Sequence, residues 1–278
     1  MKRNNAWFCK RMPWMFSLYL LFFGVPLLSM AQSASQANSI LPKGPLNQLS
    51  GQAFLSPSLK AIQNDPNTNP VSLWLEQGRV VWAGQSGQAS CAQCHGDIEK
   101  MRQAATNFPM WSAKQQRLIN LEDQILICSE RTQQPLKGLE NAEVLSLSAL
   151  LHQTSAGLSF QTTPKDEVKQ RWQLELNEGA KLFTTRMGRM NLACTHCHDL
   201  NIGKTMRADV ISPGHPTGFP IFKLSWQSMG SIDRRLRACY SGVQAEVPAP
   251  GSPELRQLEL FLKSRAQGMP IEGPSLRR

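Results

Sequence analysis

The chain has 278 residues, a formal net charge of +10 at pH 7 and an aromatic content of 7%. This length allows one large domain or two small ones. The chain is basic, but no basic run with interleaved aromatic residues supports nucleic-acid binding, and the charge instead favours an acidic protein partner or a small anionic substrate.

The first 31 residues have the pattern of a secretory signal peptide. Four basic residues come first: Lys2, Arg3, Lys10 and Arg11. An apolar run over 12–28 follows, and the small residues of 29–31 suit cleavage near Ala31. No twin-arginine pair is present, so we expect Sec-type export. A retained membrane anchor is the alternative, but two prolines and a glycine interrupt the run. No later segment is apolar enough to span a bilayer, so we expect a mature protein without a membrane span.

Two five-residue motifs of the form C-x-x-C-H stand about a hundred residues apart. They are Cys91-Ala92-Gln93-Cys94-His95 and Cys194-Thr195-His196-Cys197-His198. This motif attaches a c-type haem, with both thiols bonded to the haem and the histidine as an axial iron ligand. The sequence therefore predicts two covalently bound haem c groups, held by Cys91, Cys94, Cys194 and Cys197 with His95 and His198 on iron. Such haems are attached outside the bacterial cytoplasmic membrane, so we expect a periplasmic protein.

Around these motifs the chain divides into an irregular arm, 32–70, and two similar halves, 71–156 and 168–278. The arm is rich in Ser, Gln, Asn and Pro. Each half has an amphipathic helical pattern, the C-x-x-C-H motif, a Phe-Pro loop, a segment with one lone cysteine, and a closing amphipathic helix. The expected helices span 71–84, 139–152, 171–188 and 253–264. We therefore expect a mainly α fold.

This order of elements resembles class I cytochrome c, and it implies two tandem domains of that kind related by a pseudo-twofold repeat. In that family a small residue lets the two terminal helices cross closely beside an aromatic side chain. Gly78 with Trp82, and Gly179 with Phe183, have the spacing for that role. Ordinary variation in helix composition is the other explanation for the two glycines.

The lone cysteines, Cys128 and Cys239, are the candidates for the sixth iron ligand. Both stand between the Phe-Pro loop and the last helix of their half, whereas no methionine occupies matching positions in both halves. A thiolate donates strongly and lowers the reduction potential of iron. A Cys128–Cys239 disulfide and two buried free thiols are alternatives. Ligation by methionine, or by one of three further histidines, remains open: His152, His196 or His215.

The two cysteine segments differ in charge. Arg235 stands four residues before Cys239, whereas Gln124 stands four residues before Cys128. If these segments are helical, the residue at i−4 shares a face with the cysteine. A guanidinium there favours the thiolate and offers a planar fork of donors to an oxyanion. We interpret Cys239 as a reactive sulfur beside an anion site, and the neighbouring Arg234 and Arg237 as a solvated basic face.

The tandem motifs, the two lone cysteines and the run Arg235-Leu236-Arg237-Ala238-Cys239-Tyr240 resemble the SoxA family, the dihaem cytochrome subunits of the SoxAX complex in bacterial sulfur oxidation. The resemblance covers nearly all of the chain after residue 31. It implies an L-cysteine S-thiosulfotransferase that joins thiosulfate oxidatively to a cysteine of the carrier protein SoxYZ. It also implies a monohaem SoxX partner, a cytochrome c electron acceptor, and catalytic roles for Cys239, which can carry a persulfide in the family, and Arg235.

Two other functions compete with this one. A dihaem cytochrome c without chemistry of its own would transfer electrons only. A dihaem peroxidase would need one iron with an open or displaceable position, and two matched cysteine ligands argue against that. Replacement of Cys239 distinguishes a catalytic sulfur from a plain ligand.

Overall fold

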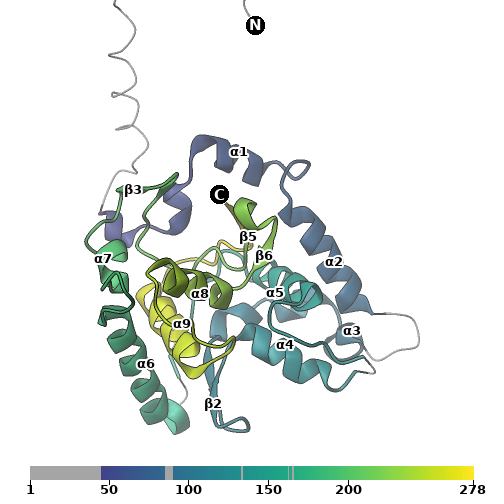
Figure 1. Ribbon diagram of the computed structural model, residues 1–278. Helices are drawn as coiled ribbons and strands as arrows, with labels where there is room; N and C mark the ends of the chain where they lie inside the picture. Colours follow the sequence, from purple (N-terminus) through teal and green to yellow (C-terminus); the bar gives the residue numbers. More distant parts are fainter. Residues whose placement is uncertain (1–44, 85–89, 133, 162, 165) are drawn as a thin grey trace, which may run out of the picture. The chain divides into compact units, whose positions relative to one another are not determined.

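The computed structural model describes residues 45–84, 90–132, 134–161, 163–164 and 166–278 (Figure 1). The expected signal peptide, 1–31, and the first part of the expected arm lie outside these residues. The described residues belong to one compact unit that spans Ile40–Arg278. Within them, no helix combines the length and the apolar character needed to cross a membrane.

Helices dominate the structure. They are α1 (Pro57–Asn64), α2 (Val71–Ala83), α3 (Cys91–His95), α4 (Leu121–Ser129), α5 (Ala142–Thr154), α6 (Lys169–Thr184), α7 (Cys194–His198), α8 (Ile232–Gly242) and α9 (Pro253–Arg265). The strands are short: β1 (Met110–Ser112), β2 (Arg117–Ile119), β3 (Thr205–Met206), β4 (Asp209–Val210), β5 (Ile221–Lys223), β6 (Ser228–Gly230) and β7 (Ser275–Arg277). The mainly α character expected from the sequence is confirmed.

The structure contains two close helix crossings, α2 against α5 and α6 against α9 (Figure 1). At the first crossing, a Cβ on Gly78 would lie 2.4 Å from the carbonyl oxygen of Ser146 on α5. At the second, a Cβ on Gly179 would lie 2.1 Å from the carbonyl oxygen of Gln257 on α9. Both distances are shorter than any van der Waals contact, so only glycine lets these backbones approach so closely. The predicted role of the two glycines is confirmed.

The strands form two hairpins and one three-stranded sheet. β1 pairs with β2, and β3 pairs with β4, both antiparallel. In the sheet, β5 lies between β6, which is antiparallel to it, and β7, which is parallel to it. Phe222 is opposite Met229 on one side and Leu276 on the other, which brings the end of the chain beside the segment that precedes α8.

The hydrophobic core connects the two halves of the sequence. One cluster joins Val71 and Leu75 of α2 with Phe222, Met229 and Leu276 of the three-stranded sheet. A second cluster around α4 and α5 also includes side chains that follow α9. Only the third cluster, which includes Phe183 and Leu236, comes from the second half alone. Each half therefore completes part of the core of the other.

Part of the segment expected to be an irregular arm is helical. Helix α1 begins at Pro57, a residue suited to the first helical position, and the Ser56 hydroxyl accepts a hydrogen bond from the Leu59 amide at 3.2 Å. Leu59 and Ile62 pack against the cluster beneath the three-stranded sheet. The expectation for 57–64 was wrong because a high content of polar residues hid a Ser-Pro helix start.

Candidate functional site

The second C-x-x-C-H motif forms the one-turn helix α7, which brings Cys194 and Cys197 onto one face. The ring of His198 is fixed by a 2.7 Å hydrogen bond between its Nδ1 and the carbonyl oxygen of Ser212. Because a carbonyl only accepts, Nδ1 carries the proton and the lone pair of Nε2 is available to a metal. Burial lowers the pKa of His198 and favours the neutral, metal-binding form.

The first motif forms α3 with the same local geometry. The Ser90 hydroxyl caps this helix by accepting a hydrogen bond from the Gln93 amide at 3.2 Å. Trp82, the aromatic residue of the first helix crossing, donates from Nε1 to the Gly96 carbonyl at 3.1 Å, and its ring centroid lies 5.9 Å from that of His95. Two thiols one turn apart, followed by an imidazole, fit a haem c in both loops.

The structure brings each lone cysteine near the C-x-x-C-H motif of its own half. These motifs are called the first haem loop (Cys91–His95) and the second haem loop (Cys194–His198) below. Burial and the nearby Cys128 raise the pKa of the Cys91 thiol. Burial and the nearby Cys239 raise the pKa of the Cys194 thiol to about 11, and the same two causes raise that of Cys197. The six cysteines of the described residues form no disulfide with one another, so Cys128 is not joined to Cys239.

The three other candidate histidines each form a hydrogen bond with the backbone. His152 is buried on α5 with its Nδ1 2.8 Å from the Ser148 carbonyl, and burial lowers its pKa to about 3. The Nδ1 of His215 lies 3.0 Å from the Leu49 carbonyl. His196 accepts a hydrogen bond from the Ala193 amide at 3.0 Å. One nitrogen of each of these rings therefore forms a local hydrogen bond with the backbone.

The two cysteine segments are helices, as the i−4 argument requires. On α4, the Gln124 amide nitrogen donates to the Cys128 sulfur at 3.0 Å. On α8, Arg235 occupies the equivalent position relative to Cys239. Burial lowers the pKa of His198, and the positive charge of Arg235 adds to this effect, so Arg235 lies near the second C-x-x-C-H motif.

The neighbouring arginines are not a solvated basic face, and this expectation was wrong. Arg234 donates to the Ser228 hydroxyl at 2.9 Å, and its Cζ stacks 4.3 Å from the centroid of the Trp226 ring. Arg237 donates to the Pro248 carbonyl at 3.0 Å. Within the described part of the chain, the Arg235 side chain makes no comparable hydrogen bond or ion pair. It is therefore the arginine of α8 with donors free for a ligand.

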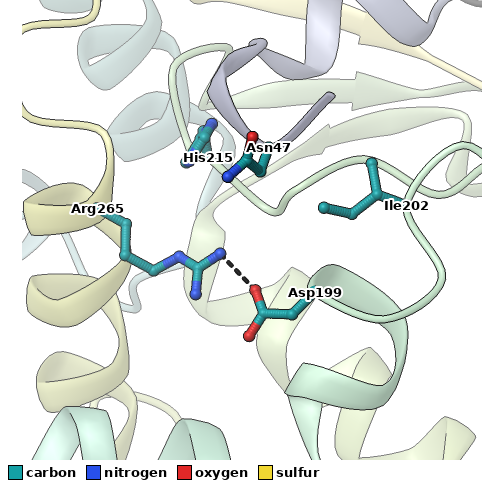
Figure 2. A pocket seen from close by; sticks show the side chains of 5 residues that line it. All are labelled: Asn47, Asp199, Ile202, His215 and Arg265. Carbon is teal, nitrogen blue, oxygen red and sulfur yellow. Dashed lines mark hydrogen bonds and ion pairs between the residues drawn. The ribbon is translucent and has the colours of Figure 1, made fainter. Parts of the chain in front are cut away.

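A cavity of about 430 Å³ adjoins the second haem loop (Figure 2). Arg265 at the end of α9 points toward Asp199, the residue after His198, and their charged groups are 2.7 Å apart. Asn47 and His215 lie on the other side of Arg265 in Figure 2. The ion pair ties α9 to the second haem loop. Nothing in the sequence indicates this ion pair, because its two residues are 66 positions apart and belong to no motif.

A second feature that the sequence analysis missed is a group of charged side chains buried along α9. Arg256 is 1% exposed and bonds to two carboxylates, those of Asp123 and Asp233. One turn or more further along, Lys263 lies 3.2 Å from Glu259. In sequence these residues look like the polar face of an amphipathic helix, so helical periodicity gives no signal for their burial.

The chain is similar to known cytochrome c proteins. The family model of the SoxA/TsdA cytochrome c domain matches residues 77–160, which include the first haem motif and Cys128. The L-cysteine S-thiosulfotransferase subunit SoxA of Pseudaminobacter salicylatoxidans is 34% identical over 235 residues, covering 83% of this chain and 81% of the relative. The subunit of the same name from Paracoccus pantotrophus is 28% identical, covering 82% of this chain and 78% of the relative.

A solved structure extends the similarity to the fold. The crystal structure of SoxXA from P. pantotrophus contains a chain that superposes with a TM-score of 0.75 at 28% identity, covering 82% of this chain and 86% of that one. The fold is therefore a cytochrome c fold of this type, whose cofactor is haem c. With 34% identity across four fifths of a curated relative, the chain belongs to the SoxA family of L-cysteine S-thiosulfotransferase subunits.

Proposed function

We propose that this chain joins thiosulfate to a cysteine of a SoxYZ-like carrier protein, with Cys239 as the reacting sulfur and Arg235 as the anion-binding group. The observation that carries the proposal is the geometry of α8. This helix brings Cys239 near Cys194 and Cys197 and holds Arg235, whose donors have no hydrogen-bond partner among the described residues, one turn before it. The name of the curated relatives supports the same activity.

The chemistry follows from the charges. The sulfane sulfur of thiosulfate and the Cys239 thiolate form an S–S bond, and two electrons leave. Arg235 binds the sulfonate oxygens through its planar fork of N–H donors. The carrier thiolate then attacks the sulfane sulfur, so that the thiosulfonate moves to the carrier and Cys239 leaves as a thiolate. The second step is an exchange and needs no further oxidant.

Two haem c groups complete the site in this proposal. Cys91 and Cys94 would hold one haem and Cys194 and Cys197 the other. His95 with Cys128, and His198 with Cys239, would bind the two irons. Haem c supplies one-electron acceptors for the electrons released in the first step. Gln124, which donates to Cys128 at 3.0 Å, carries no charge, so the position equivalent to Arg235 offers no positive charge to an anion. We assign the first site an electron-relay or structural role.

Assembly and location belong to the same proposal. The halves 71–156 and 168–278 form two tandem cytochrome c-like domains with a pseudo-twofold relation, which the paired glycine crossings support. The similarity to a chain of the SoxXA crystal structure supports a monohaem SoxX-like partner that takes electrons toward a cytochrome c acceptor. The sequence of 1–31 supports Sec-type export and a periplasmic location.

Replacement of Cys239 tests the proposal in the purified complex. We expect Cys239→Ala to abolish thiosulfate-dependent modification of the carrier, which intact mass spectrometry detects as added thiosulfonate. Cys128→Ala is the matched control, since it removes the equivalent cysteine from the other loop and should leave modification measurable. Arg235→Gln should weaken the response to thiosulfate, whereas Arg237→Gln, which alters a structural arginine, should not.

Turnover that survives Cys239→Ala would refute the proposal and leave the electron-carrier function. The intact mass of the mature protein counts the haems in the same experiment, and it reveals any additional sulfur on Cys239. A single haem mass would contradict the assignment of two cofactors.

A further inference from the structure

Arg256, on the second turn of α9, connects the two helices that carry the lone cysteines. Its Nε lies 2.6 Å from an oxygen of Asp123, and its Nη1 lies 3.0 Å from an oxygen of Asp233. Asp123 is in the first turn of α4, which carries Cys128, and Asp233 is in the first turn of α8, which carries Cys239. One guanidinium therefore contacts the start of both helices.

Both carboxylates also accept a hydrogen bond from a backbone amide. Asp123 accepts a hydrogen bond from the Asn120 amide at 3.1 Å, and the Asn120 side chain accepts one from the Asp123 amide, which forms a capping box. Asp233 accepts a hydrogen bond from the Gly251 amide at 2.8 Å, just before α9. A shift of the guanidinium therefore moves backbone as well as side chains.

The distance from each carboxylate to its cysteine is short. Cys128 follows Asp123 by five positions and Cys239 follows Asp233 by six, so each pair is separated by roughly 8 Å of continuous helix. A helix of this length is stiff, and a displacement at its first turn reaches the cysteine with little loss. The start of each helix thus determines where its sulfur lies.

Stability alone does not explain this arrangement. Removing a guanidinium and two carboxylates from water is costly, and well-packed apolar residues are often as stable as such a group. Arg256 Nη2 has no hydrogen-bond partner among the described residues, so the guanidinium is not fully satisfied. Unlike an apolar cluster, the ionic group has directional hydrogen bonds. These bonds fix the positions of both carboxylates relative to the planar guanidinium of Arg256.

We propose that Arg256 is a positioning residue that sets the location of both lone cysteines, and through α8 the location of Arg235, relative to the two haem loops. The effect of Arg256 on catalysis rests on the function proposed above. Its effect on the positions of the two cysteines does not depend on that function. We expect the two cysteine helices to respond together to a change at one buried residue of α9.

The test uses the holoprotein in its complex, with Arg256→Met as the main variant. Two readouts are recorded: the low-spin ferric electron paramagnetic resonance signals of the haems, and hydrogen exchange of the backbone amides of α4 and α8. We expect altered signals from both haems and a loss of protection of at least about tenfold in both helices. Arg117→Met is the matched control, because Arg117 pairs with Asp123 from a position that is 44% exposed, and it should leave α8 unchanged.

A purely structural role predicts lower stability with unaltered resonance signals, and that result would overturn the proposal. So would a change confined to one helix. If Arg256→Met does not fold, Asp123→Asn and Asp233→Asn replace it. Asp123→Asn should alter the haem signal and the hydrogen exchange of the α4 site, and Asp233→Asn those of the α8 site. No change in either variant would refute the proposal. Because neither readout uses thiosulfate, failure here is distinct from survival of turnover in Cys239→Ala.

Discussion

Glu122, buried beside Glu259, gives the protein a pH-dependent stability that can be measured. Glu122 is 5% exposed, and the Ser148 hydroxyl donates to it at 2.7 Å. Burial, and then the charge of Glu259, raise its pKa from 4.5 to about 7. The native protein therefore binds more protons than the unfolded chain between these two values, so stability falls as the pH rises through this window.

The size of the effect follows from the shift. A rise from 4.5 to about 7 corresponds to about 3 kcal/mol, of which about 2.5 kcal/mol is lost between about pH 5 and about pH 8. Glu122→Gln keeps an oxygen that accepts from Ser148 and removes the titration. The stability of this variant relative to the original should therefore increase by about 2.5 kcal/mol over the same interval.

Urea unfolding followed by circular dichroism, at about pH 5 and about pH 8, measures the difference. Glu143→Gln is the control, because this carboxylate is exposed in the first turn of α5, and its replacement should give nearly the same small change at both pH values. A difference between Glu122→Gln and the original protein that does not vary with pH would refute the reasoning.

Three further substitutions test the packing around the site. Gly179→Ala should lower the unfolding free energy by about 1–3 kcal/mol in thermal melts, since its Cβ would lie 2.1 Å from the Gln257 carbonyl and this clash exceeds the gain in helix propensity. Asn120→Ala removes the α4 cap and a 3.1 Å bond to buried Glu259, and should cost about 1–3 kcal/mol in urea titrations. Arg265→Met should change the free energy of unfolding by less than about 1 kcal/mol in thermal melts, because Asp199, its partner, is 37% exposed. A larger loss of stability would contradict this expectation and show that the ion pair holds the second haem loop strongly.

Local patterns in the sequence predicted much of the secondary structure and the position of Arg235 one helical turn before Cys239. The C-x-x-C-H motifs, the helix-crossing glycines and the i−4 relation of Arg235 to Cys239 each depend on residues within one or two helical turns. Helix α9 was expected over 253–264 and spans Pro253–Arg265. Such features follow from spacing alone, because backbone periodicity determines which side chains share a face.

Long-range pairings could not be predicted. Arg256 meets Asp123 across 133 positions, and no periodicity relates the two. Arg234 and Arg237 have the charge of a solvated face, and their bonds to Ser228 and Pro248 depend on how the preceding hairpin and the following loop fold back. A polar side chain looks the same in sequence whether water or a buried carboxylate receives its hydrogen bonds.

The parallel pairing of β7 with β5 has a consequence for the order of folding. Leu276 is fully buried in the cluster that also contains Val71 and Leu75 of α2. During synthesis about two hundred residues separate the emergence of these partners, and contacts of such high sequence separation form late. The part of this cluster that Leu276 covers therefore stays open until the last strand pairs with β5, and chains interrupted before Leu276 would be substrates for chaperones or proteases.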